Sequence, residues 1–187
     1  MKKPKFKLHP LPKEAERIIQ GQKAPPRLRA HLQLVHDTAR RIVRRLEKRY
    51  PVLQLDREVV LLGAALHDIG KVEHPNELRG SGSEHELAGW ELLEGLGVGP
   101  KIAVCAFTHG AWRRDPKLPL EDLLVALADQ AWKGVRSATL DNLVIDRIVE
   151  RTGVKRYEVF MKLDSLLTKI GDDSQARLEW QGQHPFK

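Results

Sequence analysis

Two acidic residues of this sequence lie at the ends of long apolar runs. Asp68 follows His67 at the end of the run VVLLGAAL, and Asp129 ends the run LLVALAD. Burying an unpaired carboxylate is costly, so each acid requires a cationic partner. A divalent metal is such a partner, and an adjacent imidazole is a natural co-ligand. Taken alone, His67-Asp68 is equally compatible with a helix end that pairs with an Arg. Two such acids are explained more economically by one metal site than by two separate salt bridges.

The first long helix expected in the sequence offers two histidines. His31 is followed by Val35 at i+4 and by Ala39 at i+8, so it is predicted to lie on the buried stripe of this helix. His36 has Arg40 at i+4 and is therefore predicted to lean toward solvent. The spacing favours His31 as a metal ligand and His36 as a flanking or surface residue.

Two further histidines complete a candidate metal site. His85 lies in the first turn of an expected helix, and His109 follows the run IAVCAFT and precedes a helix-ending glycine. Each alone is more often a capping or core histidine, but together with the other groups they form a set of nitrogen and carboxylate ligands that can hold two metals. The predicted ligands are His31, His67, Asp68, His85, His109 and Asp129. Cys105 lies in the same apolar run and is interpreted as a buried core thiol rather than a nucleophile.

The helices that must position these residues are predicted from the helical periodicity of the apolar residues. Proline, glycine and capping patterns bound the expected helices, with Asp56 as a plausible N-cap and Ser83 with Glu86 as a capping box. No segment shows the sustained alternation of a strand bounded by hairpin turns, so the predicted fold class is all-α. The expected helices cover residues 27–48, 56–70, 83–96, 100–110, 120–133, 140–151 and 155–170.

The charge of the chain is concentrated at its N-terminus. Residues 1–30 contain nine Lys or Arg and two Glu, which accounts for the whole net charge of +7. Five prolines also lie there, so residues 1–26 are predicted to be a basic, solvated, proline-containing arm outside the core. Residues 27–187 are predicted to form one helical core, with C-terminal helices from about residue 140. The arm could touch nucleic acid or an anionic surface, although a flexible solubilising extension that partly packs on the domain is the favoured interpretation.

Cysteine content and hydropathy indicate in which cellular compartment the protein is expected. The single cysteine cannot form an internal disulfide, which favours a reducing cytoplasm. No apolar stretch reaches the roughly 18 residues needed to cross a bilayer, so no membrane segment is expected. No apolar segment follows the basic N-terminus, which argues against a secretory signal. The sequence does not indicate an oligomeric state.

The ordered set His31, His67-Asp68 and Asp129 resembles the pattern H…HD…D of the HD-domain superfamily of metal-dependent phosphohydrolases. The resemblance covers about residues 28–136, where the segments LHDIGK, HELAG, FTH and LEDLLVALAD keep the order and approximate spacing. Within the superfamily the chain is most similar to the bacterial symmetrical diadenosine tetraphosphatase group. That group has extra histidines between HD and the last Asp, at positions that match His85 and His109, and binds two metals, usually iron.

The resemblance implies an HD-domain helical bundle with two divalent metals, Fe or Mn, with Mg, Co, Ni or Zn as alternatives. Asp68 would bridge them, and a metal-bound hydroxide would attack a small-molecule phosphate substrate, either a nucleotide or a dinucleoside polyphosphate. Lys71 stands where mononuclear members carry a glutamate, and a lysine cannot act as a general base there unless its pKa falls by several units. Asp68 and Lys71 are the predicted catalytic residues, because Lys71 follows the His67-Asp68 pair closely enough to contact a phosphate. Lys71, Lys133 and Arg136 are the predicted phosphate-binding residues, although a solvated surface cation is the favoured interpretation of Arg136.

Two alternatives stay open at this point. One is a mononuclear HD nucleotidase or another phosphomonoesterase. The other is a catalytically inactive HD protein with a regulatory or nucleic-acid-binding role, which the basic N-terminus supports and the intact ligand set opposes. Gln130 departs from the family pattern, because Lys or Arg commonly follows the final Asp. Trp132 could stack a base, although a buried core tryptophan is more common.

Overall fold

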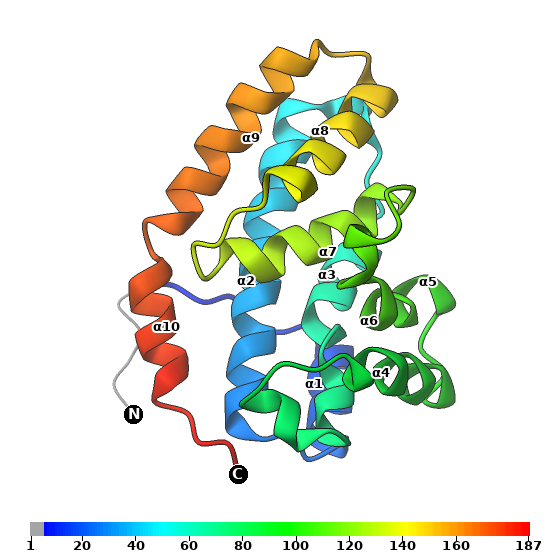
Figure 1. The fold of residues 1–187 in the computed structure, drawn as a ribbon, viewed down its shortest axis with the longest axis vertical. Coiled ribbons are helices and arrows are strands. Elements are labelled where there is room, and N and C mark those ends of the chain that lie inside the picture. The colour runs from blue at the N-terminus through cyan, green and yellow to red at the C-terminus, as the bar shows by residue number, and fades with distance from the viewer. Residues whose placement is uncertain (1–5) are drawn as a thin grey trace.

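The computed structural model describes residues 6–187, and within this range it contains helices and no strand, which confirms the all-α prediction (Figure 1). Short 3-10 turns at Pro51–Leu53, Ile69–Val72, Pro75–Leu78 and Ala111–Arg113 interrupt the connections. The α-helices are α1 (Lys13–Gly21), α2 (Pro26–Arg49), α3 (Arg57–Leu66), α4 (Glu84–Gly95), α5 (Pro100–Ala103), α6 (Cys105–Thr108), α7 (Leu120–Ala131), α8 (Ala138–Thr152), α9 (Arg156–Gly171) and α10 (Ser174–Gly182).

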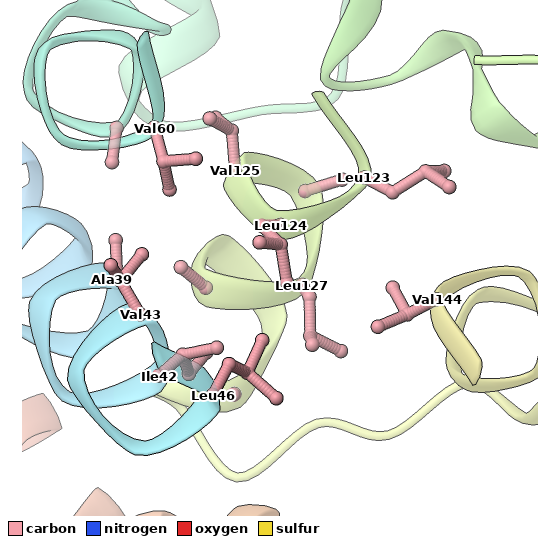
Figure 2. Packing of buried hydrophobic residues seen from close by; sticks show 14 of the residues in the cluster. Ala39, Ile42, Val43, Leu46, Val60, Leu123, Leu124, Val125, Leu127 and Val144 are labelled. Carbon is pink, nitrogen blue, oxygen red and sulfur yellow. The ribbon is translucent and has the colours of Figure 1, made fainter. Parts of the chain in front are cut away.

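Helices α2, α3 and α7 contact one another and form the centre of the core. Helix α7 is buried along almost its whole length, because its run LLVALA leaves no polar face for solvent. Figure 2 shows how its leucines pack between Ile42 and Leu46 of α2 and Val144 of α8. This packing fixes the relative positions of the three helices that carry most of the candidate ligands.

The end of α3 differs from the expectation. Its start is as predicted, since the Asp56 side chain accepts a hydrogen bond from the Val59 N–H at 3.3 Å. The helix ends at Leu66 rather than Gly70, and the backbone tightens into a 3-10 turn over Ile69–Val72. Gly70 lies against α4, where an added Cβ would collide with backbone atoms of His85 and Gly89. This close approach brings the end of α3 directly to the first turn of α4.

Two other local expectations are wrong. Ser83 makes no side-chain cap hydrogen bond, and the Glu84 N–H donates instead to the Glu77 carboxylate at 3.1 Å. The single helix expected over residues 100–110 is two short helices, α5 and α6. Near the break, the Phe107 N–H bonds to the Val104 carbonyl three residues earlier, which is the tighter 3-10 spacing.

The predicted solvated arm is wrong for the part of residues 1–26 that the structure describes. Helix α1 buries Ala15, Ile18 and Ile19 in a cluster that includes residues of α3. His9 also donates from its backbone N–H and its ring Nδ1 to Asp37 of α2, at 3.2 and 2.7 Å. A short apolar helical face therefore outweighs the high local charge. Residues 1–5 of the predicted arm lie outside the described residues.

The C-terminal helices wrap back onto the core. Gly153, with φ 67°, ends α8 in the left-handed conformation, and α9 then leads to α10. Helix α10, which the sequence analysis did not predict, contacts α2 through a buried ion pair between Arg177 and Asp37 at 2.8 Å. Among residues 6–187, no helix combines the length and apolarity that spanning a membrane requires.

Candidate metal centre

Six side chains from five parts of the fold meet at the junction of α2, α3, α4, α6 and α7. His31 projects from α2, and its Nε2 lies 3.0 Å from Asp68 Oδ2, 3.3 Å from Asp129 Oδ1 and 3.3 Å from His67 Nε2. The structure therefore brings together residues from positions 31 to 129 that the sequence analysis assigned to one site.

The Asp68 carboxylate lies between two groups of histidines. Its Oδ2 faces His31 Nε2 at 3.0 Å and His67 Nε2 at 3.7 Å. Its Oδ1 faces His85 Nε2 at 3.0 Å and His109 Nε2 at 3.5 Å. Each oxygen of one buried carboxylate thus points at a separate pair of imidazole nitrogens.

Hydrogen bonds on the far side of three imidazole rings fix their orientation. His67 Nδ1 bonds to the Ala64 carbonyl at 3.0 Å, and His109 Nδ1 bonds to the Ala106 carbonyl at 2.9 Å. His85 Nδ1 bonds to the Glu77 carboxylate. In a neutral imidazole, a proton on Nδ1 leaves the lone pair on Nε2, and the three Nε2 atoms face the centre.

The charges of the cluster suit a cation. Burial lowers the pKa of His67 to about 3, so its imidazole is neutral and can act as a ligand at neutral pH. Burial would raise the pKa of Asp68, but the Lys71 ammonium and the imidazoles of His31 and His85 hold this pKa well below its usual range. Lys71 Nζ lies 2.5 Å from Asp68 Oδ2, and Lys133 Nζ lies 3.2 Å from Asp129 Oδ2. Both carboxylates are therefore ionised.

The donor set fits divalent metals. His85 Nε2 is buried and lies 3.0 Å from Asp68 Oδ1, but the two atoms do not form a hydrogen bond. A buried nitrogen without a hydrogen-bond partner is costly unless another group binds it, and none of the described residues supplies one. The cluster contains several overlapping sets of three groups whose donor atoms all lie within 4.8 Å of one another. These sets are His31, His67 and Asp129; His67, Asp68 and His109; and His85, Glu86 and His109. Imidazole and carboxylate donors together suit Fe, Mn, Zn and related cations.

The sequence analysis missed Glu77 and Glu86. Glu77 accepts hydrogen bonds from the ring of His85 and from the backbone N–H groups of Glu84 and His85. It lies in the segment HPNELRGSGS, whose Pro, Asn, Gly and Ser content is typical of a loop, and no helical periodicity marks it. Glu86 directly follows the predicted ligand His85. Its position next to a ligand is the sequence signal that could have identified it as a further candidate ligand.

The predicted exposure of His36 is wrong. Its side chain is buried on α2 and belongs to none of the sets of clustered donor groups among the described residues, and burial lowers its pKa to about 4. The charged neighbour Arg40 was a poor guide, since a long arginine side chain can reach solvent from a largely buried position.

The predicted phosphate-binding residues separate into two groups. Lys71 and Lys133 contact the cluster carboxylates, whereas Arg136 pairs with Asp141 of α8 at 2.8 Å and with Asp164 of α9 at 3.2 Å. The structure therefore does not bring Arg136 to the cluster, because acids of the C-terminal helices hold its guanidinium.

Trp132 and Cys105 are buried residues of the hydrophobic core and take no part in the proposed chemistry. Trp132 is buried, lies edge-on to His31, and places its Nε1 3.4 Å from Asp129 Oδ1, so it packs against ligands instead of presenting a face for a base. Cys105 is also buried, and burial raises the pKa of its thiol well above the usual value, as expected for a core thiol.

We expect Glu77→Ala to weaken metal binding about 10- to 100-fold, since it removes the carboxylate that orients His85. The exposed Glu73, four residues earlier, provides a matched control variant, Glu73→Ala. Competition with a coloured chelator measures both affinities, and thermal melting of the metal-free proteins checks the fold. Equal affinities in the two variants would show that His85 does not need this hydrogen bond.

Comparison with known proteins agrees with this geometry. The HD domain family model matches residues 29–131, which is more than half of the chain and includes all six clustered residues. An uncharacterized protein of Methanocaldococcus jannaschii is 33% identical over 114 residues, which cover 54% of this chain and 63% of that protein. The chain thus spans less than two thirds of the length of this relative.

No solved structure matches the chain significantly. These comparisons do not support the diadenosine tetraphosphatase group over other subgroups, so that finer resemblance stays a prediction. The family match and the convergence of the H…HD…D residues agree, and the chain belongs to the HD-domain family, whose members are generally metal-dependent phosphohydrolases.

Proposed function

We propose that this protein is a binuclear metal-dependent phosphohydrolase that acts on a nucleotide or a dinucleoside polyphosphate. The observation that carries the proposal is the position of Asp68, which presents one carboxylate oxygen to each of two histidine pairs. A mononuclear site would not need the second pair, His85 and His109, to be aimed at the same carboxylate. Two cations are therefore favoured over one.

The ligands divide into two sets around the shared Asp68. His31, His67 and Asp129 would hold one cation, and His85 with His109 would hold the other, with Glu86 near enough to contribute. Divalent cations bound there would polarise a phosphoryl group and lower the pKa of a coordinated water to about 7. The mixture of imidazole and carboxylate ligands supports Fe or Mn.

Lys71 is the residue of this chain best placed to act on the substrate. Its ammonium contacts Asp68, and its side chain is about one fifth exposed, at 19%. When metals share the Asp68 charge, this ammonium becomes available to bind an anionic oxygen of the substrate and to stabilise charge that develops there. Lys133, which contacts Asp129 from the next turn of the chain, is proposed to bind an outer phosphate in the same way.

A substrate screen with controlled metal content tests the proposal. We expect metal-stripped protein to be inactive, and Mn or Fe to restore hydrolysis of a dinucleoside polyphosphate or nucleotide, with about two metals bound per chain. Co, Ni and Mg are compared in parallel, and sugar phosphates and simple monoesters serve as competing substrates.

Two outcomes would contradict specific parts of the proposal. Saturation at one metal, with no loss in His85→Ala or His109→Ala, would exclude the binuclear site. Activity restricted to simple monoesters would leave the metal chemistry intact and replace the nucleotide substrate by the phosphomonoesterase alternative.

A further inference from the structure

A basic groove of about 1030 Å³ lies between the C-terminal half of α2 and the length of α9, remote from the metal cluster. Figure 1 shows these two helices side by side in the upper part of the molecule. Ten residues separate His31 from Arg41 along α2, which corresponds to about 15 Å of helix. We call this feature the α2–α9 groove. It is lined by Arg41, Arg44, Arg45, Leu46, Lys48, Arg49, Tyr50, Val159, Met161, Lys162, Leu163, Ser165, Leu166 and Lys169.

Every charged side chain that lines the α2–α9 groove is a cation. Arg41, Arg44, Arg45 and Lys48 are spaced at i, i+3, i+4 and i+7, so they share one face of α2. Arg41 is paired with Asp173 at 3.2 Å, and the Glu158 carboxylate lies near Tyr50. Within residues 6–187, the other lining cations have no carboxylate within salt-bridge distance. The groove is therefore strongly positive and largely unneutralised.

Tyr50 adds a polar group that lacks an acceptor. Its side chain is buried in the groove lining, and no described residue accepts a hydrogen bond from its hydroxyl. A buried donor without an acceptor costs free energy, which a ligand oxygen would recover. Together with the surrounding cations, this donor indicates a ligand rich in anionic oxygens.

The length of the groove indicates more than one phosphate. Arg41 to Arg49 spans about 12 Å of helix, which matches about three to four phosphates of a stacked strand at roughly 3.4 Å per phosphate. Tyr157, at 72% exposure, lies one turn before the lining residue Met161, so it offers an aromatic surface near one end of the groove. A concave groove with an apolar floor that includes Leu46 and Leu163 suits a flexible single strand better than a flat membrane surface or a wide duplex.

We propose that the α2–α9 groove binds single-stranded nucleic acid, with the cations contacting its phosphates and Tyr157 stacking against a base. The groove involves none of the clustered residues, so this binding would not depend on the proposed hydrolase function. The proposed nucleic-acid-binding surface therefore lies on the folded core. The sequence alone suggests such a role only for the basic N-terminal residues.

Fluorescence anisotropy with the full-length protein tests this proposal. The probes are labelled RNA and DNA single strands of about 12 nucleotides, the matching duplex, and vesicles with and without an anionic lipid. The test variant is Arg44→Gln/Arg45→Gln/Lys48→Gln. The control variant, Lys13→Gln/Arg17→Gln/Lys117→Gln, removes the same charge from exposed positions outside the groove.

We expect the groove variant to bind single strands at least about 10-fold more weakly than wild type, and the control variant to bind within about twofold. The slope of log affinity against log salt should fall by about 2 in the groove variant, since each lost phosphate contact contributes about 0.7 for a single strand. Tyr157→Ser should weaken strand binding and leave this slope unchanged.

Other outcomes would overturn the proposal. Equal losses in the groove and control variants would show that net charge alone drives binding. Tighter binding to the duplex would exclude the single-strand assignment, and groove-dependent binding to anionic vesicles without strand binding would identify a membrane surface instead. No binding to any strand at about 50 mM salt would show that the groove is only a solvated basic face.

Discussion

Asp68→Ala is expected to lose both proposed metals and to reduce the proposed hydrolysis to the level of metal-stripped protein. Asp68 is the only clustered residue with an oxygen facing each histidine pair, so its removal affects both proposed cation sites at once. Loss of His85 or His109 should affect mainly one of them. Elemental analysis after reconstitution and turnover of the best substrate from the screen measure the two effects.

Two additional variants make this experiment decisive. Asp68→Asn keeps the shape of the side chain and removes only its charge, so a loss seen in both variants is not explained by a folding defect of the alanine variant. Asp172→Ala, which changes an exposed aspartate far from the cluster in sequence, should retain metals and activity. Hydrolysis that survives in Asp68→Ala would refute the mechanism together with the substrate assignment.

Arg177→Met is expected to lower the free energy of unfolding by about 3 to 5 kcal/mol, because it leaves the buried Asp37 carboxylate without its principal charged partner. Both side chains of this pair are 1% exposed, and the Arg177 guanidinium also contacts the Thr38 hydroxyl. The pair joins α10 to α2, and His9 brings the N-terminal segment to the same carboxylate. Urea denaturation of the metal-free protein measures the change.

The exposed pair Arg41–Asp173 provides the matched control. It also joins α2 to the C-terminal region, but its side chains are 31% and 45% exposed, so Arg41→Met should cost less than about 1 kcal/mol. The double variant Asp37→Leu/Arg177→Met should recover part of the lost stability, since neither buried charge remains. Similar costs for Arg177→Met and Arg41→Met would show that burial does not decide the strength of these pairs.

The sequence predicted well what helical periodicity controls. Asp68 and Asp129 end apolar runs that had to be buried, and the i+4 and i+8 neighbours of His31 identified the face of α2 that meets them. The long helices were expected close to their observed bounds for the same reason. The convergence of these residues then follows from packing three apolar helices together.

The features that depend on distant partners could not be predicted. Arg177 and Asp37 are 140 residues apart, so no local pattern announces their pairing. The lysines and prolines of residues 1–26 predict a solvated arm, although helix α1 within this segment has one apolar face, on which Ile18 and Ile19 are buried. Glu77 accepts a hydrogen bond from the His85 ring, but it lies in a turn whose composition does not differ from that of an ordinary loop.

The hydrogen bonds behind the imidazole rings have a consequence for how the site tolerates mutation. His67 and His109 are oriented by main-chain carbonyls three residues earlier, and a carbonyl persists whatever side chain occupies its residue. His85 instead relies on a side chain, Glu77, which a single nucleotide change can remove. The part of the site around His67 is therefore robust to genetic drift at its supporting positions, whereas the part around His85 is readily lost. In the proposed binuclear site, the cation on the α4 side is therefore the one that descendants of such a protein should lose first.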